Sequence, residues 1–303
     1  MAGEHLGKIN FETKGSMIMG HFHAMANPCL IIIEHQSINK KIDLIKKSMF
    51  QMAAEVWRIE QKYSRYLENS ALSKINNANG AKVPIDPETY QLLNVADILW
   101  QESNGMFDIS SGVFRKIWTF DNQQNIPSQT EIDSVLEYVG WDRIKLDKES
   151  LQLEQNMQID FGGIGKEYAA DRCASLAPES LGKSVLVNLG GDVVAKGPRN
   201  NLLNWDVGIE SKSGRKVWKN VPLGSGAIAT SGDVYKSITY KGKRYSHIIN
   251  ALTGYPTLEA PSTISVAAPN CVEAGMLSTL AMLQGENAEN FLEDSGRPHW
   301  IQR

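Results

Sequence analysis

The sequence predicts an α+β fold for a chain of 303 residues. Two segments with helical periodicity come early, and segments with the apolar patterns of strands dominate from residue 151 onward. Runs of helices and meander-like strands of this kind favour an α+β architecture over a doubly wound parallel sheet. The composition, with 42% hydrophobic and 21% charged residues, is that of a globular protein with an ample core.

The first half of the chain is predicted to contain two strands and two helices. Residues 17–35 have the pattern of two strands around an Asn-Pro turn. Residues 41–66 place apolar side chains at steps of three and four, which indicates a long amphipathic helix. The polar residues 67–80 are expected to form a loop. A second helix should begin at Asp86, a capping residue, with Pro87 as its first residue.

The second half is predicted to consist mainly of strands. Residues 151–159 alternate in the manner of a strand and lead into the glycine-rich residues 160–171, which continue as a helix. Helices are also expected near 272–284 and 287–294. Further strands are predicted in five segments, at 184–197, 205–211, 226–235, 236–249 and 262–269.

Charge, hydropathy and cysteine spacing disfavour several classes of protein. The formal net charge of −3 argues against a general nucleic-acid or membrane-surface binder. No apolar run approaches the roughly 20 residues that span a bilayer, and the first 15 residues lack an apolar signal-peptide core. Cys29, Cys173 and Cys271 form no metal-type pair. A cytoplasmic protein is therefore expected, although an exported or lipid-anchored protein trimmed of its signal would look the same.

The stretch DFGGIGKEYAAD at 160–171 has the glycines and the lysine of a phosphate site at a strand-to-helix junction. It is not a P-loop, because Asp160 and Glu167 occupy the places of a required glycine and a required Ser or Thr. It is not a dinucleotide fingerprint either, because Tyr168 replaces the third glycine. The loop alone therefore does not identify its ligand.

Several polar residues near glycine-marked turns could carry chemistry or could be structural. Asp108 and Asp160 each follow an apolar segment, and either could simply cap a turn. Lys166 could be a solvated charge. His247, beside Ser246, is the most reactive candidate among the six histidines, although a lone histidine is more often structural.

His21 and His23 alternate on a predicted strand and would share one of its faces. Two histidines on one face could bind a metal ion. They have no acidic or cysteine partner nearby in the sequence, so a structural role is favoured.

Eight segments, taken together and in order, resemble the FAD:protein FMN transferase family, also called the ApbE-like or thiamine biosynthesis lipoprotein family. The segments are Met19-Gly20, 63–76, 105–118, 159–172, 185–197, 228–235, 243–256 and 274–285. The resemblance implies one domain at 17–285, with two interlocked lobes of mixed or antiparallel sheet, flanking helices and a flavin in the cleft. Residues 1–16 and 286–303 would be terminal extensions.

The resemblance implies that the phosphate compound is FAD. Asp160 would then accept hydrogen bonds from the ligand, Phe107 or Met106 would cover a flat ring, and Lys166 would point toward the pyrophosphate. The complete set of implied flavin-site residues is Met19, Met106, Phe107, Asp108, Asp160, Lys166 and Ile248.

The implied reaction transfers FMN from FAD to a threonine hydroxyl of an acceptor protein and releases AMP. This is a phosphoryl transfer, in which a divalent cation neutralises phosphate charge and a base near neutral pH takes the hydroxyl proton. His247 would be the catalytic base. Two alternatives remain open from the sequence, namely an FAD-binding protein that has lost most catalysis and a hydrolase that cuts FAD to FMN and AMP.

The implied Mg²⁺ site departs from the family pattern. The backbone near Gly163 and the Thr279 hydroxyl remain as ligands, but Gly275 stands where the family has a metal-binding aspartate. Glu273 would lie on another helix face. The sequence thus predicts a weakened metal site that an aspartate at 275 would strengthen.

Smaller departures lie elsewhere. Glu167 stands where the family usually has glycine, and Asn250-Ala251 where it usually has Asp-Pro.

Overall fold

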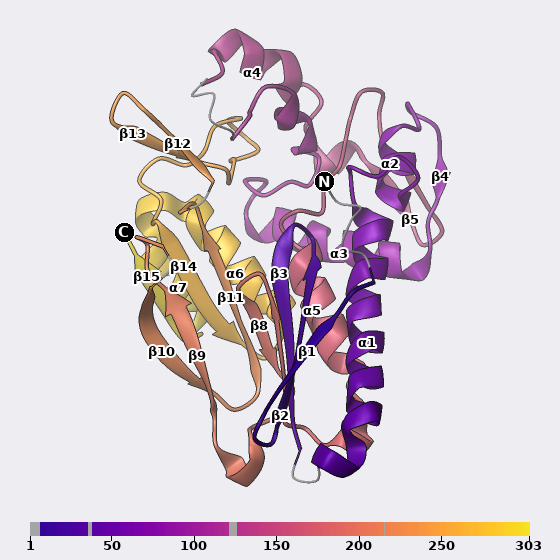
Figure 1. The fold of residues 1–303 in the computed structure, drawn as a ribbon. Helices are drawn as coiled ribbons and strands as arrows, with labels where there is room; N and C mark the ends of the chain where they lie inside the picture. The colour runs from indigo at the N-terminus through magenta and orange to yellow at the C-terminus, as the bar shows by residue number, and fades with distance from the viewer. Residues whose placement is uncertain (1–6, 36–37, 121–125, 215, 235) are drawn as a thin grey trace.

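An eight-stranded antiparallel sheet forms the centre of the molecule (Figure 1). The computed structural model describes residues 7–35, 38–120, 126–214, 216–234 and 236–303. In their order across the sheet the strands are β1 (Asn10–Lys14), β2 (Met17–Ala24), β3 (Asn27–Glu34), β7 (Val185–Leu189), β8 (Asp192–Ala195), β11 (Gly226–Gly232), β14 (Thr263–Ala268) and β15 (His299–Gln302).

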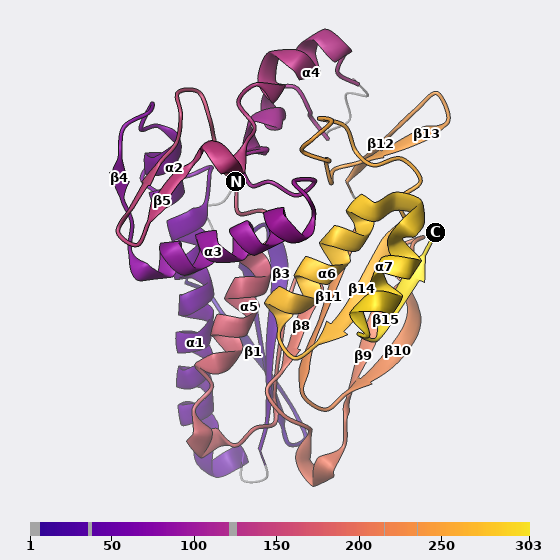
Figure 2. The same ribbon diagram turned by 180° about the vertical axis from the view of Figure 1, so that it is seen from behind.

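Helices cover one face of this sheet and a β-hairpin covers part of the other (Figures 1 and 2). The helices are α1 (Ile38–Tyr63), α5 (Gly165–Ser175), α6 (Cys271–Gln284) and α7 (Ala288–Ser295). The hairpin consists of β9 (Trp205–Glu210) and β10 (Val217–Leu223), and alternate residues of β9 are buried against the sheet. Both faces are therefore apolar, which explains the continuous apolar runs of the central strands.

The smaller elements gather above one end of the large sheet (Figure 1). They are α2 (Ala71–Asn76), α3 (Pro87–Glu102), α4 (Gln129–Leu136), a sheet of β4 (Val83–Pro84), β5 (Lys145–Asp147) and β6 (Ser150–Gln152), and a hairpin of β12 (Ser237–Tyr240) and β13 (Lys243–Ser246). Short 3₁₀ helices lie at Gly112–Lys116, Trp141–Arg143, Glu179–Leu181, Asn200–Leu202 and Gly285–Asn287. The loops that carry the candidate residues meet at this end.

The predicted α+β class and the main helices are confirmed. Helix α3 begins at Pro87, and the Asp86 side chain accepts a hydrogen bond from the Thr89 N–H at 2.8 Å, as a capping residue should. The apolar stripe of α1 is buried in the main core. Among the described residues, no helix combines the length and the apolarity that a membrane span needs.

Two strands lie in the segments that the sequence treats as terminal extensions. Strand β1 pairs with β2, and β15 pairs with β14, so both belong to the large sheet. Their short lengths and mixed burial give little periodic signal in the sequence.

Three local predictions were wrong in part. The expected loop 67–80 contains helix α2, capped by the Ser70 side chain, which accepts from the Ser73 N–H. The expected strand 151–159 is extended only at its start, in β6. The turn between β2 and β3 lies at Met25 and Ala26, both with positive φ, and Asn-Pro already belongs to β3.

Candidate functional site

The glycine-rich loop before α5 is fastened to the turn at 105–110. The Asp160 N–H donates to the Ile109 carbonyl at 2.9 Å. Gly163 lies against the Phe107 ring, and a Cβ at position 163 would stand 2.9 Å from the ring carbon Cε2. The glycine is therefore required by the close approach of an aromatic ring, which explains one glycine that a phosphate motif does not.

The turn at 105–110 is also joined to the residues after β13. The Ala251 N–H donates to the Met106 carbonyl at 2.9 Å. Met106, Phe107 and Ile248 are partly buried against the same core. Three segments that are far apart in the sequence thus adjoin, and they bring five of the predicted flavin-site residues and Gly163 into one region.

Asp108 stabilises this region from within. One carboxylate oxygen accepts from the Ser110 N–H and hydroxyl, and the other accepts from the Trp141 N–H, at 2.6–2.8 Å. The residue is only 5% exposed, and burial raises the pKa of its carboxyl in spite of these bonds. Asp108 is fully engaged in holding two loops together, so the structure supports its turn-capping role.

Lys166, in the first turn of α5, forms an ion pair with Asp192 at the start of β8. Asp192 is 1% exposed, and its other oxygen accepts from the Thr230 N–H at 3.4 Å. The lysine therefore neutralises a buried carboxylate and joins α5 to the sheet. Its charge is already paired, which differs from the free pyrophosphate ligand that the sequence suggests.

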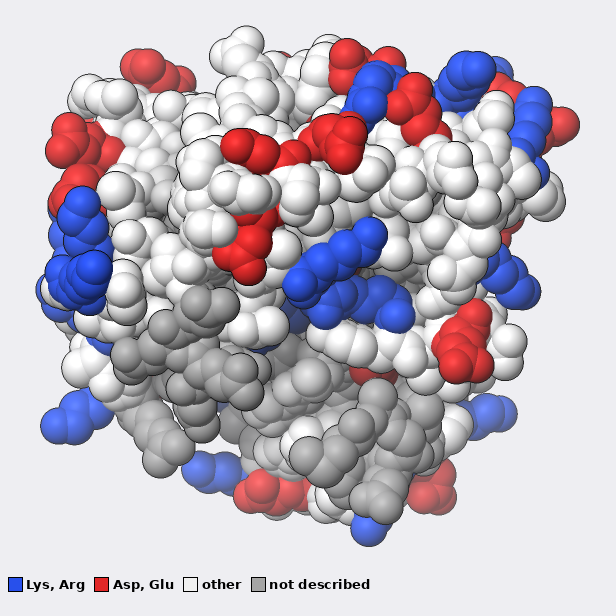
Figure 3. Space-filling view, turned by 90° about the horizontal axis from the view of Figure 1, so that it is seen from above, with Lys and Arg blue, Asp and Glu red and all other residues white. Residues whose placement is uncertain are grey.

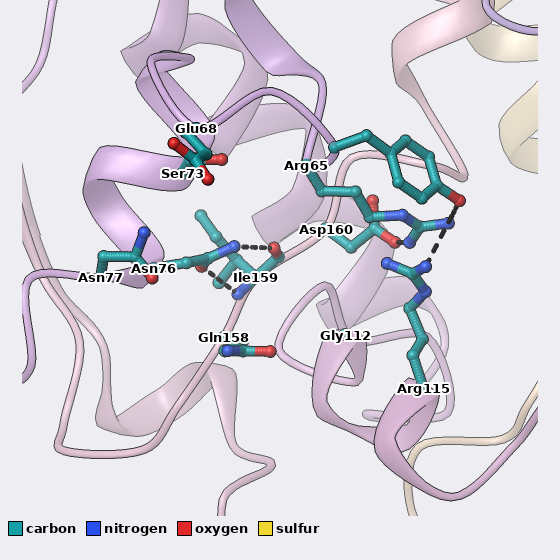
Figure 4. Close-up of a pocket in the computed structure, with 11 residues that line it drawn as sticks. Arg65, Glu68, Ser73, Asn76, Asn77, Gly112, Arg115, Gln158, Ile159 and Asp160 are labelled. Carbon is teal, nitrogen blue, oxygen red and sulfur yellow. Dashed lines mark hydrogen bonds and ion pairs between the residues drawn. The ribbon is translucent and has the colours of Figure 1, made fainter. Parts of the chain in front are cut away.

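A pocket of about 210 Å³ lies between residues 65–77 and the start of the glycine-rich loop (Figure 4). Asp160 forms an ion pair with Arg65 at its edge, and its second oxygen accepts from the Gly162 N–H at 3.0 Å. Asp160 thus caps a turn and also faces a cavity, so both roles considered for it remain compatible with the structure.

Asn76 lines this pocket and binds the backbone of Ile159 with its side-chain amide. The Asn76 side chain donates to the Ile159 carbonyl at 2.9 Å and accepts from the Ile159 N–H at 2.8 Å (Figure 4). This amide replaces the backbone partner that a strand at 151–159 would have needed. These two hydrogen bonds also hold the backbone directly before Asp160 in place.

Cations surround Tyr66 at the mouth of the pocket. The guanidinium groups of Arg65 and Arg115 lie 5.1 Å and 5.4 Å from the centre of its ring. Burial acts to raise the pKa of Tyr66, but the hydrogen bond from Arg65 and the charges of Arg65, Arg115 and Lys236 outweigh it and lower the pKa. Seen from above, basic side chains gather near the middle of this face (Figure 3). Such a mouth attracts anionic ligands.

The segment 63–76 was part of the family resemblance, but none of its residues was predicted to belong to the site. Arg65, Tyr66 and Asn76 all lie within the segment 63–76, which matched the family pattern. The match itself was the signal that could have found them.

His247 follows β13 and is held by the backbone of Lys236. Its Nδ1 lies 3.1 Å from the Lys236 carbonyl, and its ring meets the edge of Phe120, with 6.3 Å between ring centres. A carbonyl only accepts hydrogen bonds, so Nδ1 carries the proton and Nε2 of the neutral ring is left as an acceptor. Loss of hydration lowers the pKa of His247 although the residue reaches solvent. A neutral imidazole whose Nε2 is an acceptor can act as a base near pH 7.

Met19 is not brought to these loops. It lies within β2, opposite Ile32, six residues before the turn at Met25, which is roughly 20 Å at about 3.3 Å per residue. That turn adjoins the site end of the sheet, because Asn27 packs against Gly190 in the turn just before Asp192. The turn at Met25 therefore lies nearer to this end of the sheet than Met19 does.

Thr279 lies on α6 in a chain of hydroxyl groups. Ser278 donates to the Gly275 carbonyl at 3.1 Å, and Ser231 lies 2.8 Å from Ser278 Oγ and 2.9 Å from Thr279 Oγ1. Each hydroxyl has one proton, so Ser231 donates to Ser278 and Thr279 donates to Ser231. The Thr279 oxygen keeps its lone pairs for another partner. The described residues contain no group of three or more His, Cys, Asp or Glu placed to hold a metal.

Comparisons with known proteins identify the family of the chain. The model of the ApbE family matches residues 28–299. The FAD:protein FMN transferase of Escherichia coli K12 is 27% identical over 269 residues, which cover 85% of this chain and 76% of that protein. The Haemophilus influenzae protein of the same name is 28% identical, over 80% of this chain and 74% of its own length.

Solved structures show the same fold. The ApbE protein of Thermotoga maritima superposes with a TM-score of 0.82 at 28% identity, covering 97% of this chain and 94% of that one. The flavin transferase ApbE of Vibrio cholerae gives a TM-score of 0.80 at 23% identity, over 96% and 94% of the two chains. The predicted family is confirmed: this chain belongs to the ApbE family.

Proposed function

We propose that this protein is an FAD:protein FMN transferase, which moves FMN from FAD to a threonine hydroxyl of an acceptor protein and releases AMP. The observation that carries the proposal is the family match over residues 28–299, in a family whose curated relatives bear that name. The matched segment includes every loop of the site described above except the turn at Met25.

FAD would bind at the end of the sheet where these loops meet. Met106 and Phe107 offer apolar surface for a flat ring, and the pocket beside Asp160 and Arg65 offers polar partners. Helix α5 begins there, and the positive end of its dipole favours a pyrophosphate. The cations around Tyr66 favour the approach of a dianionic ligand.

His247 would remove the proton from the attacking threonine. Its Nε2 is an acceptor in the neutral ring, and the lowered pKa keeps the ring neutral near pH 7. A bound divalent cation such as Mg²⁺ would neutralise charge that builds on the phosphates. The Gly163 carbonyl and the Thr279 hydroxyl, whose lone pairs are free, fit that cation as oxygen ligands.

Incubation of the purified protein with FAD and Mg²⁺ tests the function. A transferase releases AMP only when a threonine-bearing acceptor is present, and the acceptor retains flavin fluorescence after denaturing electrophoresis. An extract of the source cells supplies the acceptor, with heat-inactivated protein as the control. AMP release that is independent of acceptor would indicate the hydrolase, and saturable FAD binding without AMP release would indicate a binding protein. Either outcome contradicts the proposal.

A further inference from the structure

Glu167, in the first turn of α5, is a buried acid that the site described so far does not use. Its residue is 8% exposed, and its Oε2 atom has no hydrogen-bond partner in the described part of the chain. A buried carboxylate without a partner is costly, and the neighbouring Lys166 already pairs with Asp192. Something outside the chain is therefore expected to satisfy this oxygen.

Gly275 of α6 makes the space that the Glu167 side chain occupies. A Cβ built at position 275 would stand 2.5 Å from Glu167 Cγ and 3.0 Å from both Cδ and Oε1. Real Cβ atoms essentially never come that close, so a side chain at position 275 would require Glu167 to move. The two departures from the family pattern, 108 positions apart in the chain, are thus one structural feature.

The pairing of the two helices carries this carboxylate toward Thr279. Asp171 of α5 accepts from the Cys271 and Val272 N–H groups at the start of α6. Four residues back along α5 and four forward along α6, Glu167 meets Gly275. Four residues further along α6 lies Thr279, on the same face of that helix as Gly275, while Gly163 precedes α5 in the glycine-rich loop.

We infer that Glu167 supplies the carboxylate ligand of a divalent cation at the α5–α6 contact. The carboxylate comes from α5 across Gly275 instead of from position 275 itself. One carboxylate with a hydroxyl, a carbonyl and substrate phosphate oxygens is the usual donor set for Mg²⁺. This inference rests on the proposed function only for the phosphate that completes the set.

Electrostatics at this end of α5 supports a cation rather than direct contact with FAD. A pyrophosphate held at the N-terminus of α5 would lie near an acid in the first turn of the same helix. Two anions at close range repel one another in a poorly hydrated site unless a cation lies between them. The Lys166 charge also acts on Glu167 but is paired with Asp192, so a metal ion would supply the further positive charge.

Binding of Mn²⁺ to the full chain tests the inference without reference to activity. Free Mn²⁺ is measured by electron paramagnetic resonance during titration, with and without saturating FAD. The variants are Glu167→Gln, the exchange variant Glu167→Gly with Gly275→Asp, and the control Glu273→Gln, whose carboxylate is paired with Arg297 on another face of α6. Urea unfolding without metal shows whether each variant is folded.

Glu167→Gln should weaken Mn²⁺ binding at least about tenfold, since even partners outside the ligand shell contribute that much to metal affinity. Glu273→Gln should bind as the parent does, and the exchange variant should regain most of the affinity. Parental affinity in Glu167→Gln would overturn the inference, and so would an exchange variant that is folded but binds weakly. If Glu167→Gln does not fold, the exchange variant alone decides. Loss of FMN transfer with this binding pattern intact would count against the proposed function and not against the ligand.

Discussion

The turn at 105–110 and the contact between α5 and α6 each bury a carboxylate, but the two carboxylates differ in their hydrogen bonding. Asp108 accepts three hydrogen bonds from Ser110 and Trp141, whereas Glu167 Oε2 has no partner among the described residues. Burial raises the pKa of both carboxyl groups, so the pKa direction does not distinguish them. The hydrogen bonds do distinguish them. Both carboxylate oxygens of Asp108 have partners within the chain, whereas Glu167 Oε2 needs a partner from a ligand.

The largest expected effect belongs to a residue outside this pair. His247→Ala should lower the rate of FMN transfer by about 10²–10⁴-fold, because a general base acts mainly in the transition state. FAD affinity should change by less than about tenfold. AMP release and calorimetric FAD titration on the same preparation give both numbers. Transfer at the parental rate would show that His247 is not the base.

Asp108→Ala should have the largest effect on folding. It leaves the Ser110 and Trp141 N–H groups without their acceptor in a buried turn, and we expect a loss of about 3 kcal/mol in the free energy of unfolding. Urea unfolding measures the loss, and FAD titration at low urea measures binding by the folded fraction. A stable variant that no longer binds FAD would make Asp108 a ligand and would erase its contrast with Glu167.

Gly275→Asp alone should destabilise the protein by about 2 kcal/mol and should not strengthen metal binding. The sequence predicted the opposite, but the new Cβ would collide with Glu167 and bring a second negative charge beside it. Removal of the glutamate as well should recover the stability. Melting curves of the single and double variants, with and without Mg²⁺, check this. A single variant that is as stable as the parent and binds metal more tightly would break the comparison.

Asp160 is a half-buried carboxylate that can be compared with the two buried ones through the variant Asp160→Asn. The asparagine oxygen can still accept from the Gly162 N–H, so the unfolding free energy should fall by less than about 1 kcal/mol. The ion pair with Arg65 is lost at the pocket edge, and FAD binding should weaken about tenfold, or about 1.4 kcal/mol. Thermal melting and FAD titration of one variant rank the two effects. The reverse ranking would reduce Asp160 to a turn cap.

The smallest expected effect is on the pH profile. The ordinary pKa of a histidine side chain is 6.5, and loss of hydration lowers the pKa of His247 below that value. A base works when it is unprotonated, so transfer should rise with pH through a midpoint below 6.5 and be level at pH 7. Initial rates of AMP release, measured from about pH 5 to about pH 8 so that the usual pKa of histidine is included, locate the midpoint. A midpoint above 6.5 would mean that another group is titrating.

The elements with strong local signals could be predicted from the sequence, and the contacts between distant segments could not. Asp86 and Pro87 mark the start of α3, and the apolar stripe marks α1. Strand β15 is short and lies after the last predicted helix, and it is identifiable only by its partner β14. Local pattern is sufficient where the neighbours in space are also neighbours in sequence.

The site shows the same division. The family pattern located Met106, Phe107, Asp160, Ile248 and His247 on loops that adjoin in the structure. It could not show that Asp108 is saturated or that Lys166 is paired, because the partners lie 33 and 26 residues away. In the sequence, Glu167 and Gly275 are two separate departures from the family pattern, because neither local sequence indicates a contact with the other residue.

The position of Mn²⁺ in crystals grown with FAD tests the central claim most directly. Anomalous scattering locates the metal independently of the protein atoms. We expect a peak at the α5–α6 contact within bonding distance of a Glu167 oxygen, next to the FAD phosphates and the Thr279 hydroxyl. A peak that lies elsewhere, or a metal at this contact with the Glu167 carboxylate turned away from it, would contradict the account.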